Sequence, residues 1–269
     1  MMGATMVHKN ELRVTLVQTE LLWQQPEANR TLLAEKLSPL AGHTDLVILP
    51  EMFTTCFMMS PEDHAEPMQS ETLAWLQAQA ALLDAAICGS VAIQEGDAYI
   101  NRMILVDPAG KVQFYDKCHL FRMGNEHQHY RAGTERVIFE YAGWRILPTI
   151  CYDLRFPVFM RNQNDYDLAI CVANWPAPRR APWRTLLQAR AIENQCYMLG
   201  VNRIGEDGVG LQYSGDSLAI NFKGELLLDK PQGKSFVATV HLHLDEVQQF
   251  RDVFPAWQDA DEFSLMLDR

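Results

Sequence analysis

The sequence predicts an α/β fold in which mixed β-sheets are covered by helices. Strand-like and helix-like stretches alternate along the chain, and antiparallel hairpins are inserted between them. Several strand-like stretches are continuously apolar, as fully buried strands are, and 45–50 (DLVILP) shows this clearly. Because no linker, low-complexity tract or composition break interrupts the pattern, we expect one domain over 11–269 after a flexible N-terminal segment, 1–10.

The expected elements follow from apolar periodicity and from turn residues. The DPAG sequence at 107–110 is a hairpin signal, and 119–135 is polar and irregular. Helices are expected over 27–40, 73–83, 156–164, 180–195 and 244–251. Strands are expected over 11–20, 45–50, 85–94, 99–106, 111–115, 144–150, 167–174, 196–203, 216–222, 224–229 and 235–242, and one more directly before Ala142-Gly143.

Composition excludes several classes of partner. The 269 residues are 48% hydrophobic and 21% charged, which is ordinary for a protein with a large core. The formal net charge of −11 argues against nucleic-acid binding, which needs a basic face. Neither a signal peptide in 1–10 nor an apolar run of roughly 18 residues is present, so we expect a cytoplasmic protein that acts on a small molecule and not at a membrane.

The cysteines are expected to be reduced. No pair has C-x-x-C spacing, and a disulfide framework is not expected in a chain of this length without an export signal. Cysteines in apolar strands are typically small buried core residues. They stand at Cys56, Cys88, Cys118, Cys151, Cys171 and Cys196.

Three reactive side chains follow three expected strands. Glu51 comes after 45–50, Lys117 after 111–115, and Cys151 directly after 144–150. In open α/β sheets, ligands bind beyond the carboxyl ends of strands, so these side chains can meet in one pocket. Singly, Glu51 and Lys117 would be ordinary surface charges and Cys151 a core thiol, and it is the joint arrangement that indicates a site.

The surroundings of these residues resemble the nitrilase superfamily of carbon–nitrogen hydrolases. The resemblance rests on LPEMF around Glu51, YDKCHLF around Lys117 and ICYDLRFP around Cys151, with further matches in NRMILVDPAGK, VANWP and RAIENQCYMLGVNR. It extends from about Leu12 to Val240. It implies a four-layer α-β-β-α sandwich with two mixed sheets, which periodicity alone does not select, and an assembly of paired subunits.

The resemblance implies a Glu–Lys–Cys amidase mechanism. A thiolate attacks an amide to form a thioester, and a free thiol with a pKa of about 8.5 needs a base near neutral pH. Glu51 is the expected base, and Lys117 the expected donor to the oxyanion. The backbone N–H of Tyr152 is a second oxyanion donor by resemblance. No metal or organic cofactor is required.

A second glutamate, Glu126, precedes Gly133 as one does in many family members. By resemblance it positions Lys117 and the substrate amide. Glu51, Glu126 and a Cys151 thiolate would carry three negative charges against one lysine, so a dry site should retain a proton. We expect that proton to be shared between Cys151 and Glu51.

Several nearby residues are candidates for substrate contacts. Trp175 and Phe53 are possible pocket walls, and Asp153 with Arg155 is expected to form an ion pair bracing the turn after the nucleophile. One arginine could hold a substrate carboxylate by bidentate hydrogen bonds. The candidates for that role are Arg179, Arg180 and Arg184.

Other classes of function remain as alternatives. A metal-binding protein could use His119, Glu126, His127 and His129, although their spacing matches no common zinc motif. A serine hydrolase is disfavoured because G-x-S-x-G is absent. A non-catalytic family member is disfavoured because Glu51, Lys117 and Cys151 are all present.

Within the family, CYDLRFP and ANWP most resemble the omega-amidase branch, which hydrolyses 2-oxo dicarboxylic acid monoamides such as 2-oxoglutaramate. An amidase or nitrilase acting on a simple aliphatic amide or nitrile is the alternative. A homodimer is expected, because the closing segment 253–266 (VFPAWQDADEFSLM) is apolar enough to pack on a neighbouring subunit.

Overall fold

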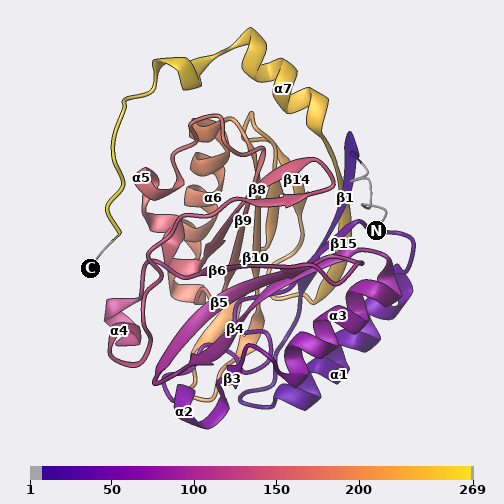
Figure 1. Cartoon of the computed structure of the whole chain (residues 1–269), viewed down its shortest axis with the longest axis vertical. Helices are drawn as coiled ribbons and strands as arrows, with labels where there is room; N and C mark the ends of the chain where they lie inside the picture. Colours follow the sequence, from indigo (N-terminus) through magenta and orange to yellow (C-terminus); the bar gives the residue numbers. More distant parts are fainter. Residues whose placement is uncertain (1–7, 268–269) are drawn as a thin grey trace.

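Two β-sheets stack face to face at the centre of the protein, and helices cover both outer faces (Figure 1). The computed structural model describes residues 8–267. The expected four-layer α-β-β-α arrangement is confirmed. Of the segment expected to be flexible, residues 1–7 lie outside the described residues, whereas the Lys9 N–H donates to the Ala142 carbonyl.

The first sheet has the strand order β15-β1-β2-β4-β5-β6, with β3 beside β4. Strands β1, β2 and β4 are parallel neighbours, and β15, β5 and β6 join them in antiparallel pairs. The bounds are β1 Glu11–Gln18, β2 Leu46–Ile48, β3 Glu66–Pro67, β4 Ala86–Glu95, β5 Ala98–Val106, β6 Val112–Asp116 and β15 Phe236–His243.

The second sheet repeats this plan in the order β14-β13-β10-β9-β8-β7, again with three parallel strands, β8, β9 and β10. Its bounds are β7 Phe139–Tyr141, β8 Trp144–Ile150, β9 Leu168–Ala173, β10 Tyr197–Asn202, β13 Leu218–Ile220 and β14 Leu226–Asp229. A separate hairpin, β11 (Ile204–Glu206) and β12 (Gln212–Ser214), was not expected from the sequence. Its strands are too short to show a period, although the Asp207-Gly208 turn signal lies between them.

The helices confirm most expected positions. α1 (Pro26–Leu37) and α3 (Glu71–Leu83) cover the first sheet, while α5 (Pro157–Met160) and α6 (Arg180–Asn194) cover the second. Helix α7 (Leu244–Val253) closes the chain, and α2 (Pro61–His64) and α4 (Glu126–His129) are single turns. The helix expected over 27–40 ends early, because Pro39 has no N–H to continue it, and 38–40 form a 3₁₀ turn.

The core explains why the layers stack. Alternate residues of the first sheet's strands face opposite ways: Leu46 and Ile48 pack against the second sheet, whereas Val47 packs under α1 and α3. On the other side, α6 approaches β10 closely at Gly200, where a β-carbon would lie 2.4 Å from a Leu187 methyl carbon. Only glycine fits there, so this residue sets the distance between helix and sheet.

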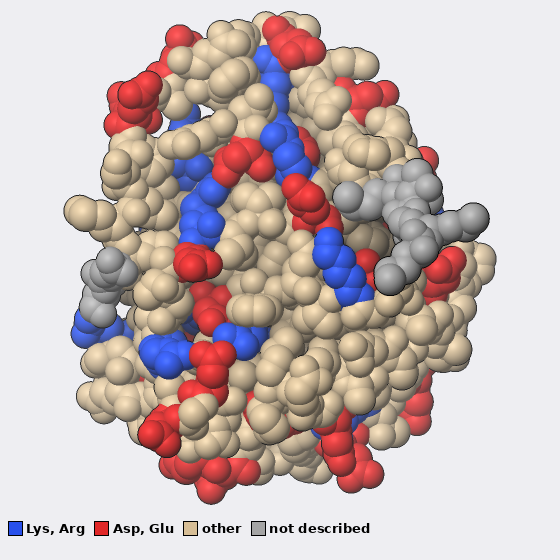
Figure 2. All heavy atoms as spheres, in the orientation of Figure 1, with Lys and Arg blue, Asp and Glu red and all other residues tan. Residues whose placement is uncertain are grey.

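The charged residues on the face drawn in Figure 2 are mixed in sign, with Lys and Arg next to Asp and Glu and no continuous basic area. In the part of the chain that the structure describes, no helix is long and apolar enough to cross a membrane.

Candidate active site

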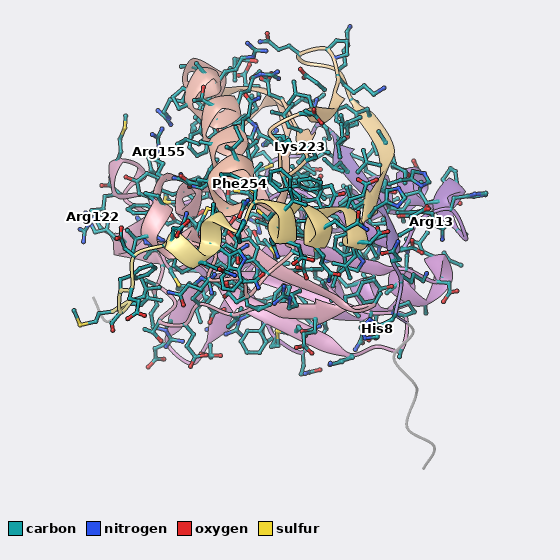
Figure 3. The ribbon with its side chains drawn as sticks, turned by 90° about the horizontal axis from the view of Figure 1, so that it is seen from above. His8, Arg13, Arg122, Arg155, Lys223 and Phe254 are labelled. Carbon is teal, nitrogen blue, oxygen red and sulfur yellow. The ribbon has the colours of Figure 1, made fainter. Side chains whose placement is uncertain are left out.

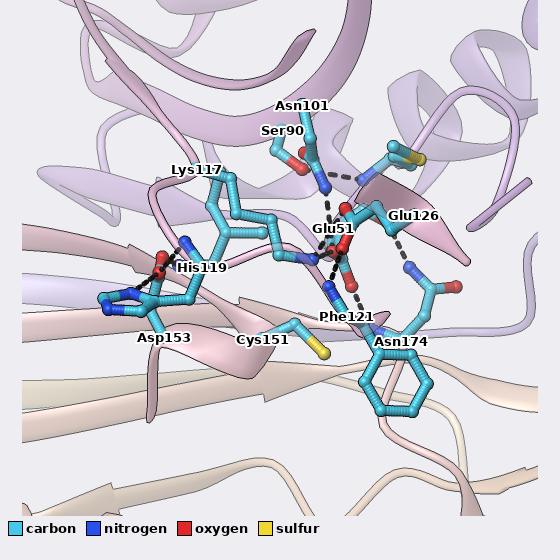
Figure 4. A network of polar contacts seen from close by, with 12 residues as sticks. Glu51, Ser90, Asn101, Lys117, His119, Phe121, Glu126, Cys151, Asp153 and Asn174 are labelled. Carbon is cyan, nitrogen blue, oxygen red and sulfur yellow. Dashed lines mark hydrogen bonds and ion pairs between the residues drawn. The ribbon is translucent and has the colours of Figure 1, made fainter. Parts of the chain in front are cut away.

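The carboxyl ends of strands from both sheets meet at one cluster of side chains. Glu51 follows β2 and Lys117 follows β6 in the first sheet, while Cys151 follows β8 in the second. Figure 4 shows Glu51, Lys117 and Glu126 joined by polar contacts, with Cys151 beside them and its sulfur on the side of Glu51. The structure therefore brings together the four residues expected at the centre of the site.

Both oxygens of the Glu51 carboxylate are fixed. Oε1 accepts hydrogen bonds from Lys117 Nζ at 3.0 Å and from the Asn101 amide at 2.9 Å, and Oε2 accepts from the Asn174 backbone N–H at 2.7 Å. The Asn174 side chain also donates to the Glu51 carbonyl at 2.7 Å. Since Glu51 is fully buried, these donors hold one carboxylate orientation.

Lys117 lies between two carboxylates. Its Nζ donates to Glu51 Oε1 and, at 2.9 Å, to Glu126 Oε1, and it lies 5.1 Å from the centre of the Phe57 ring. Burial alone would lower the pKa of Lys117, but Glu126 and Glu51 outweigh burial and raise that pKa well above its usual value. The ammonium is therefore charged in the resting site.

Glu126 begins α4 and turns back onto Lys117. Its second oxygen accepts the Phe121 backbone N–H at 2.6 Å. Burial raises the pKa of Glu126, and the Lys117 charge opposes that shift. The carboxyl is fully buried, so its contacts fix both the lysine and the loop that carries Phe121.

Cys151 stands on a strained turn between β8 and a 3₁₀ turn, Cys151–Arg155, with a φ of 47°. The turn is held by Asp153, which accepts the Ile150 N–H at 2.9 Å and the Tyr115 hydroxyl at 2.8 Å on Oδ2. Its Oδ1 accepts the His119 backbone N–H at 3.0 Å and lies 2.7 Å from His119 Nδ1.

The expected Asp153–Arg155 ion pair is therefore wrong. Asp153 is fully buried and makes four polar contacts with three residues, while the Arg155 guanidinium stacks 4.8 Å from the centre of the Trp175 ring. A 3₁₀ turn has three residues per turn, so residues two apart point away from each other.

Burial raises the pKa of the Cys151 thiol well above its usual value, and the Glu51 charge adds to that shift. Cys151 is nevertheless partly exposed, whereas the other five cysteines are buried. The resting nucleophile candidate is a neutral thiol that can be reached from a cavity.

That cavity has a volume of about 440 Å³, within the range typical of small-molecule sites. Lys117, Cys151, Tyr152 and Trp175 all line it. Phe53 does not: it packs on the opposite face of the first sheet, with its ring 5.8 Å from that of Trp75. The expectation that Phe53 forms a pocket wall is wrong, because the turn after Glu51 directs this side chain into the core beneath α3.

Two arginines in the cavity wall lack a carboxylate partner among residues 8–267. Arg155 lies over Trp175, and Arg179 lies 5.3 Å from the centre of the Phe121 ring. By contrast, Arg180 pairs with Asp216, and Arg184 pairs with Asp216 and Asp229. Of the three arginines considered from sequence, only Arg179 is placed to meet a ligand, and Arg155 joins it.

The alternative metal site is not assembled. His119 is buried against Asp153, while Glu126 faces Lys117. Among residues 8–267, no group of three or more His, Cys, Asp or Glu side chains is arranged to hold a metal ion.

Comparison with known proteins identifies the family. The carbon–nitrogen hydrolase family profile matches residues 13–252. The chain belongs to the carbon–nitrogen hydrolase family. It is 50% identical over 255 residues to the omega-amidase YafV of Escherichia coli K12, a match covering 94% of this chain and 98% of that protein.

Two further similarities support this placement. The chain is 30% identical over 251 residues to the 2-oxoglutaramate amidase of Bacillus subtilis 168, covering 91% of this chain and 96% of that protein. The crystal structure of XC1258 from Xanthomonas campestris, a CN-hydrolase superfamily protein with an arsenic adduct in its active site, is 46% identical with a TM-score of 0.93. That match covers 96% of this chain and all of the other.

Sequence reasoning missed several residues of this carbon–nitrogen hydrolase. Asn101 and Asn174 orient Glu51, and the β11–β12 hairpin supplies part of the cavity wall. Asn174 carried a signal that could have found it, because it follows the apolar strand β9 as Glu51 follows β2.

Proposed function

We propose that this carbon–nitrogen hydrolase is an omega-amidase that releases ammonia from monoamides of 2-oxo dicarboxylic acids, such as 2-oxoglutaramate, through a thioester on Cys151. The observation that carries the proposal is a buried Glu51–Lys117–Glu126 cluster beside a reachable thiol, in a cavity whose wall holds two arginines that pair with no carboxylate of the described chain, 8–267. The names of the relatives, omega-amidase and 2-oxoglutaramate amidase, support the same substrate class.

The first half of the reaction forms the thioester. Glu51 accepts the Cys151 proton as the sulfur attacks the amide carbon, and the carbonyl π electrons move to oxygen. Lys117 Nζ and the Tyr152 backbone N–H donate to the resulting oxyanion. As the C–N bond breaks, Glu51 returns the proton to nitrogen, and ammonia leaves.

The second half regenerates the thiol. Glu51 takes a proton from a water molecule as the water oxygen attacks the thioester carbon. Lys117 again donates to the oxyanion. Collapse expels the Cys151 sulfur, which recovers the proton from Glu51 and leaves a carboxylic acid. Throughout, Glu126 keeps Lys117 charged and in place, which supports the expected positioning role.

Arg155 and Arg179 provide the recognition of a substrate carboxylate in this proposal. A guanidinium matches the two oxygens of a carboxylate, and stacking on Trp175 and Phe121 restricts the positions of the two groups. A simple amide or nitrile without a carboxylate offers neither arginine a partner, which is why we favour the omega-amidase function over those alternatives.

The test is ammonia release from 2-oxoglutaramate, 2-oxosuccinamate, glutamine, a simple nitrile and an N-carbamoyl amino acid. We expect the two oxo acid amides to have the highest kcat/KM. Preference for the nitrile or for the N-carbamoyl amino acid would contradict the proposal.

Arginine variants test the carboxylate contact directly. Arg155→Ala should lower kcat/KM for 2-oxoglutaramate by about 10- to 100-fold, chiefly through KM, because a charged hydrogen bond is lost. Arg180→Ala is the matched control, since Arg180 is already paired with Asp216. Equal effects of the two substitutions would show that Arg155 does not contact the substrate.

We also propose a homodimer, with 11–269 acting as one catalytic domain. The closing segment exposes Val253, Phe254 and Met266, and Figure 3 looks down on α7 with Phe254 and Lys223 beside it. Exposed apolar groups of this kind are typical of subunit contacts. Light scattering at micromolar protein that gave the mass of one 30.7 kDa chain would reject the dimer.

A cytoplasmic location is proposed on chemical grounds. The mechanism requires a reduced Cys151, and no disulfide joins any two cysteines among residues 8–267. Reducing compartments preserve such thiols. Fractionation of the source cells that placed the activity outside the cytoplasm would contradict this.

A further inference from the structure

The cavity beside Cys151 is lined by side chains of two chemical kinds. Arg155 and Arg179 contribute guanidinium groups. A set of apolar side chains, here called the apolar wall, comes from Trp23, Phe57, Met59, Val209 and Leu211. The carboxylate of an oxo acid amide has charged partners in the two arginines, whereas these five side chains offer it no charged group.

The Val209 and Leu211 part of the apolar wall is held in place by the β11–β12 hairpin. Asp207 holds the hairpin tip, because its Oδ1 accepts the backbone N–H groups of Val209 and Leu211 at 3.0 and 2.9 Å. Its Oδ2 accepts the Tyr213 hydroxyl at 2.9 Å. With these bonds, the tip presents its apolar side chains to the cavity in a defined position.

Two more contacts tie the hairpin to the body of the protein. The fully buried Arg203 donates from Nη2 to the Leu21 and Glu206 carbonyls at 3.1 and 2.9 Å. Gly208 lies against Trp23, where a β-carbon would come within 2.4 Å of the indole ring. The hairpin and Trp23 thus form one surface.

The cavity is also larger than the proposed substrate. A volume of about 440 Å³ is suited to a drug-sized ligand, whereas 2-oxoglutaramate has about ten non-hydrogen atoms. A molecule of that size held by the arginines and by Cys151 fills only part of this volume, and Val209 and Leu211 line the same cavity. Water in that space would face apolar groups, so an apolar substituent there is favoured.

We propose that the enzyme also hydrolyses monoamides of dicarboxylic acids that carry an alkyl or aryl group on the acyl chain, with that group packed against the wall of Val209 and Leu211. This inference rests on the proposed function, because it uses the same carboxylate contacts and the same thioester. The reaction is unchanged: the C–N bond breaks, the substituted acyl group passes to Cys151 and then to water, and ammonia is released.

The experiment measures kcat/KM for 2-oxoglutaramate, glutaric acid monoamide and 3-isobutylglutaric acid monoamide, each enantiomer of the last separately. At least one enantiomer should be hydrolysed with a kcat/KM about tenfold or more above that of glutaric acid monoamide, as expected for burying several methyl and methylene groups. A kcat/KM for both enantiomers below that of glutaric acid monoamide would overturn the inference.

Variants locate the effect on the wall. Leu211→Asn should lower the ratio of kcat/KM for the isobutyl compound to that for glutaric acid monoamide by about tenfold. Val209→Asn should lower the ratio by about threefold. Because Val209 is 79% exposed, this substitution should not disturb folding. Leu226→Asn, an exposed leucine of β14 outside the cavity, is the matched control and should leave it unchanged. An unchanged ratio in both wall variants would overturn the inference.

The two proposals fail separately. If the enzyme did not hydrolyse 2-oxoglutaramate but preferred the isobutyl compound to glutaric acid monoamide, the omega-amidase function alone would be rejected. Activity on 2-oxoglutaramate without that preference would reject the apolar subsite alone.

Discussion

Two buried polar networks lie near Cys151, and they differ in the groups that they fix in position. The network of Glu51, Lys117 and Glu126 consists of charged side chains, and Lys117 reaches the cavity. The network of Tyr115, His119 and Asp153 is closed, because the Phe156 ring stacks 3.8 Å from His119 and Phe159 meets its edge.

The hydrogen bonds of the two networks join different kinds of group. In the first, the lysine ammonium lies between both carboxylates, and in the proposed mechanism it donates to the oxyanion while Glu51 transfers a proton. In the second, Asp153 accepts the backbone N–H groups of Ile150 and His119 and so fixes the turn that carries Cys151. Under the proposed mechanism the first network supplies chemistry and the second supplies position, so their loss should change different measurable quantities.

The largest effect is expected where the two networks meet. Cys151→Ala should abolish ammonia release while leaving the melting temperature near that of the unaltered enzyme, because it removes the group that forms the thioester in the proposed mechanism. Cys171→Ala, at a buried thiol on β9, is the control and should cost stability at most. More than a few per cent of residual activity in Cys151→Ala would refute the mechanism.

The next effect probes the charged network. Lys117→Met keeps much of the side-chain length and removes the proposed oxyanion donor, so kcat should fall by about 10²–10³. Lys117→Arg keeps the charge but places its donors differently, and little activity should return. Rapid-quench trapping should find slow acyl-enzyme formation with Cys151 still open to alkylation.

Near-normal kcat/KM in Lys117→Met would show that the lysine is only a counter-charge.

A smaller loss of activity is expected from the positioning network. Asp153→Asn removes an acceptor of backbone N–H groups and shifts the Cys151 turn, so kcat should fall by about 10- to 100-fold. The melting temperature should also fall, by about 3–8 °C, because buried donors lose their partner. Asp165→Asn, at a half-buried carboxylate that pairs with Arg136, is the control.

If Asp153→Asn and Lys117→Met gave the same ratio of the fold loss in kcat to the drop in melting temperature, the two networks would not have separate roles.

The smallest effect is expected in the pH dependence of alkylation at the Cys151 thiol of the substrate-free enzyme. Because burial and Glu51 raise the pKa of Cys151, the thiolate fraction should keep increasing with pH through pH 9. The rate of iodoacetamide alkylation at Cys151, followed by mass spectrometry, should therefore rise by about tenfold per pH unit from pH 7 to 9. A plateau below pH 8 would indicate a thiolate with a depressed pKa and would contradict the shared-proton interpretation.

The buried thiols provide an internal reference, since burial raises the pKa of Cys88 to about 12. In the folded enzyme Cys88 should stay unmodified over the same pH range.

Much of the fold follows from local sequence. Apolar runs and turn residues predicted the strands, most helices and the hairpin at 107–110, because strand and helix periods are written into neighbouring residues. The four-layer stacking came from the family resemblance, since periodicity does not say which sheet packs on which. Of the helix expected over 156–164, only the single turn of α5, Pro157–Met160, forms.

By itself, the sequence determined that Glu51, Lys117 and Cys151 stand at strand ends, with Glu126 in the polar stretch between Lys117 and Cys151. Only the tertiary structure decided which neighbours face the cavity. Phe53 turned into the core, and Arg180 turned to Asp216, which is 36 residues away in the chain. The physical reason is that strand ends depend on local patterns, whereas the direction of a side chain depends on partners that folding brings from distant segments.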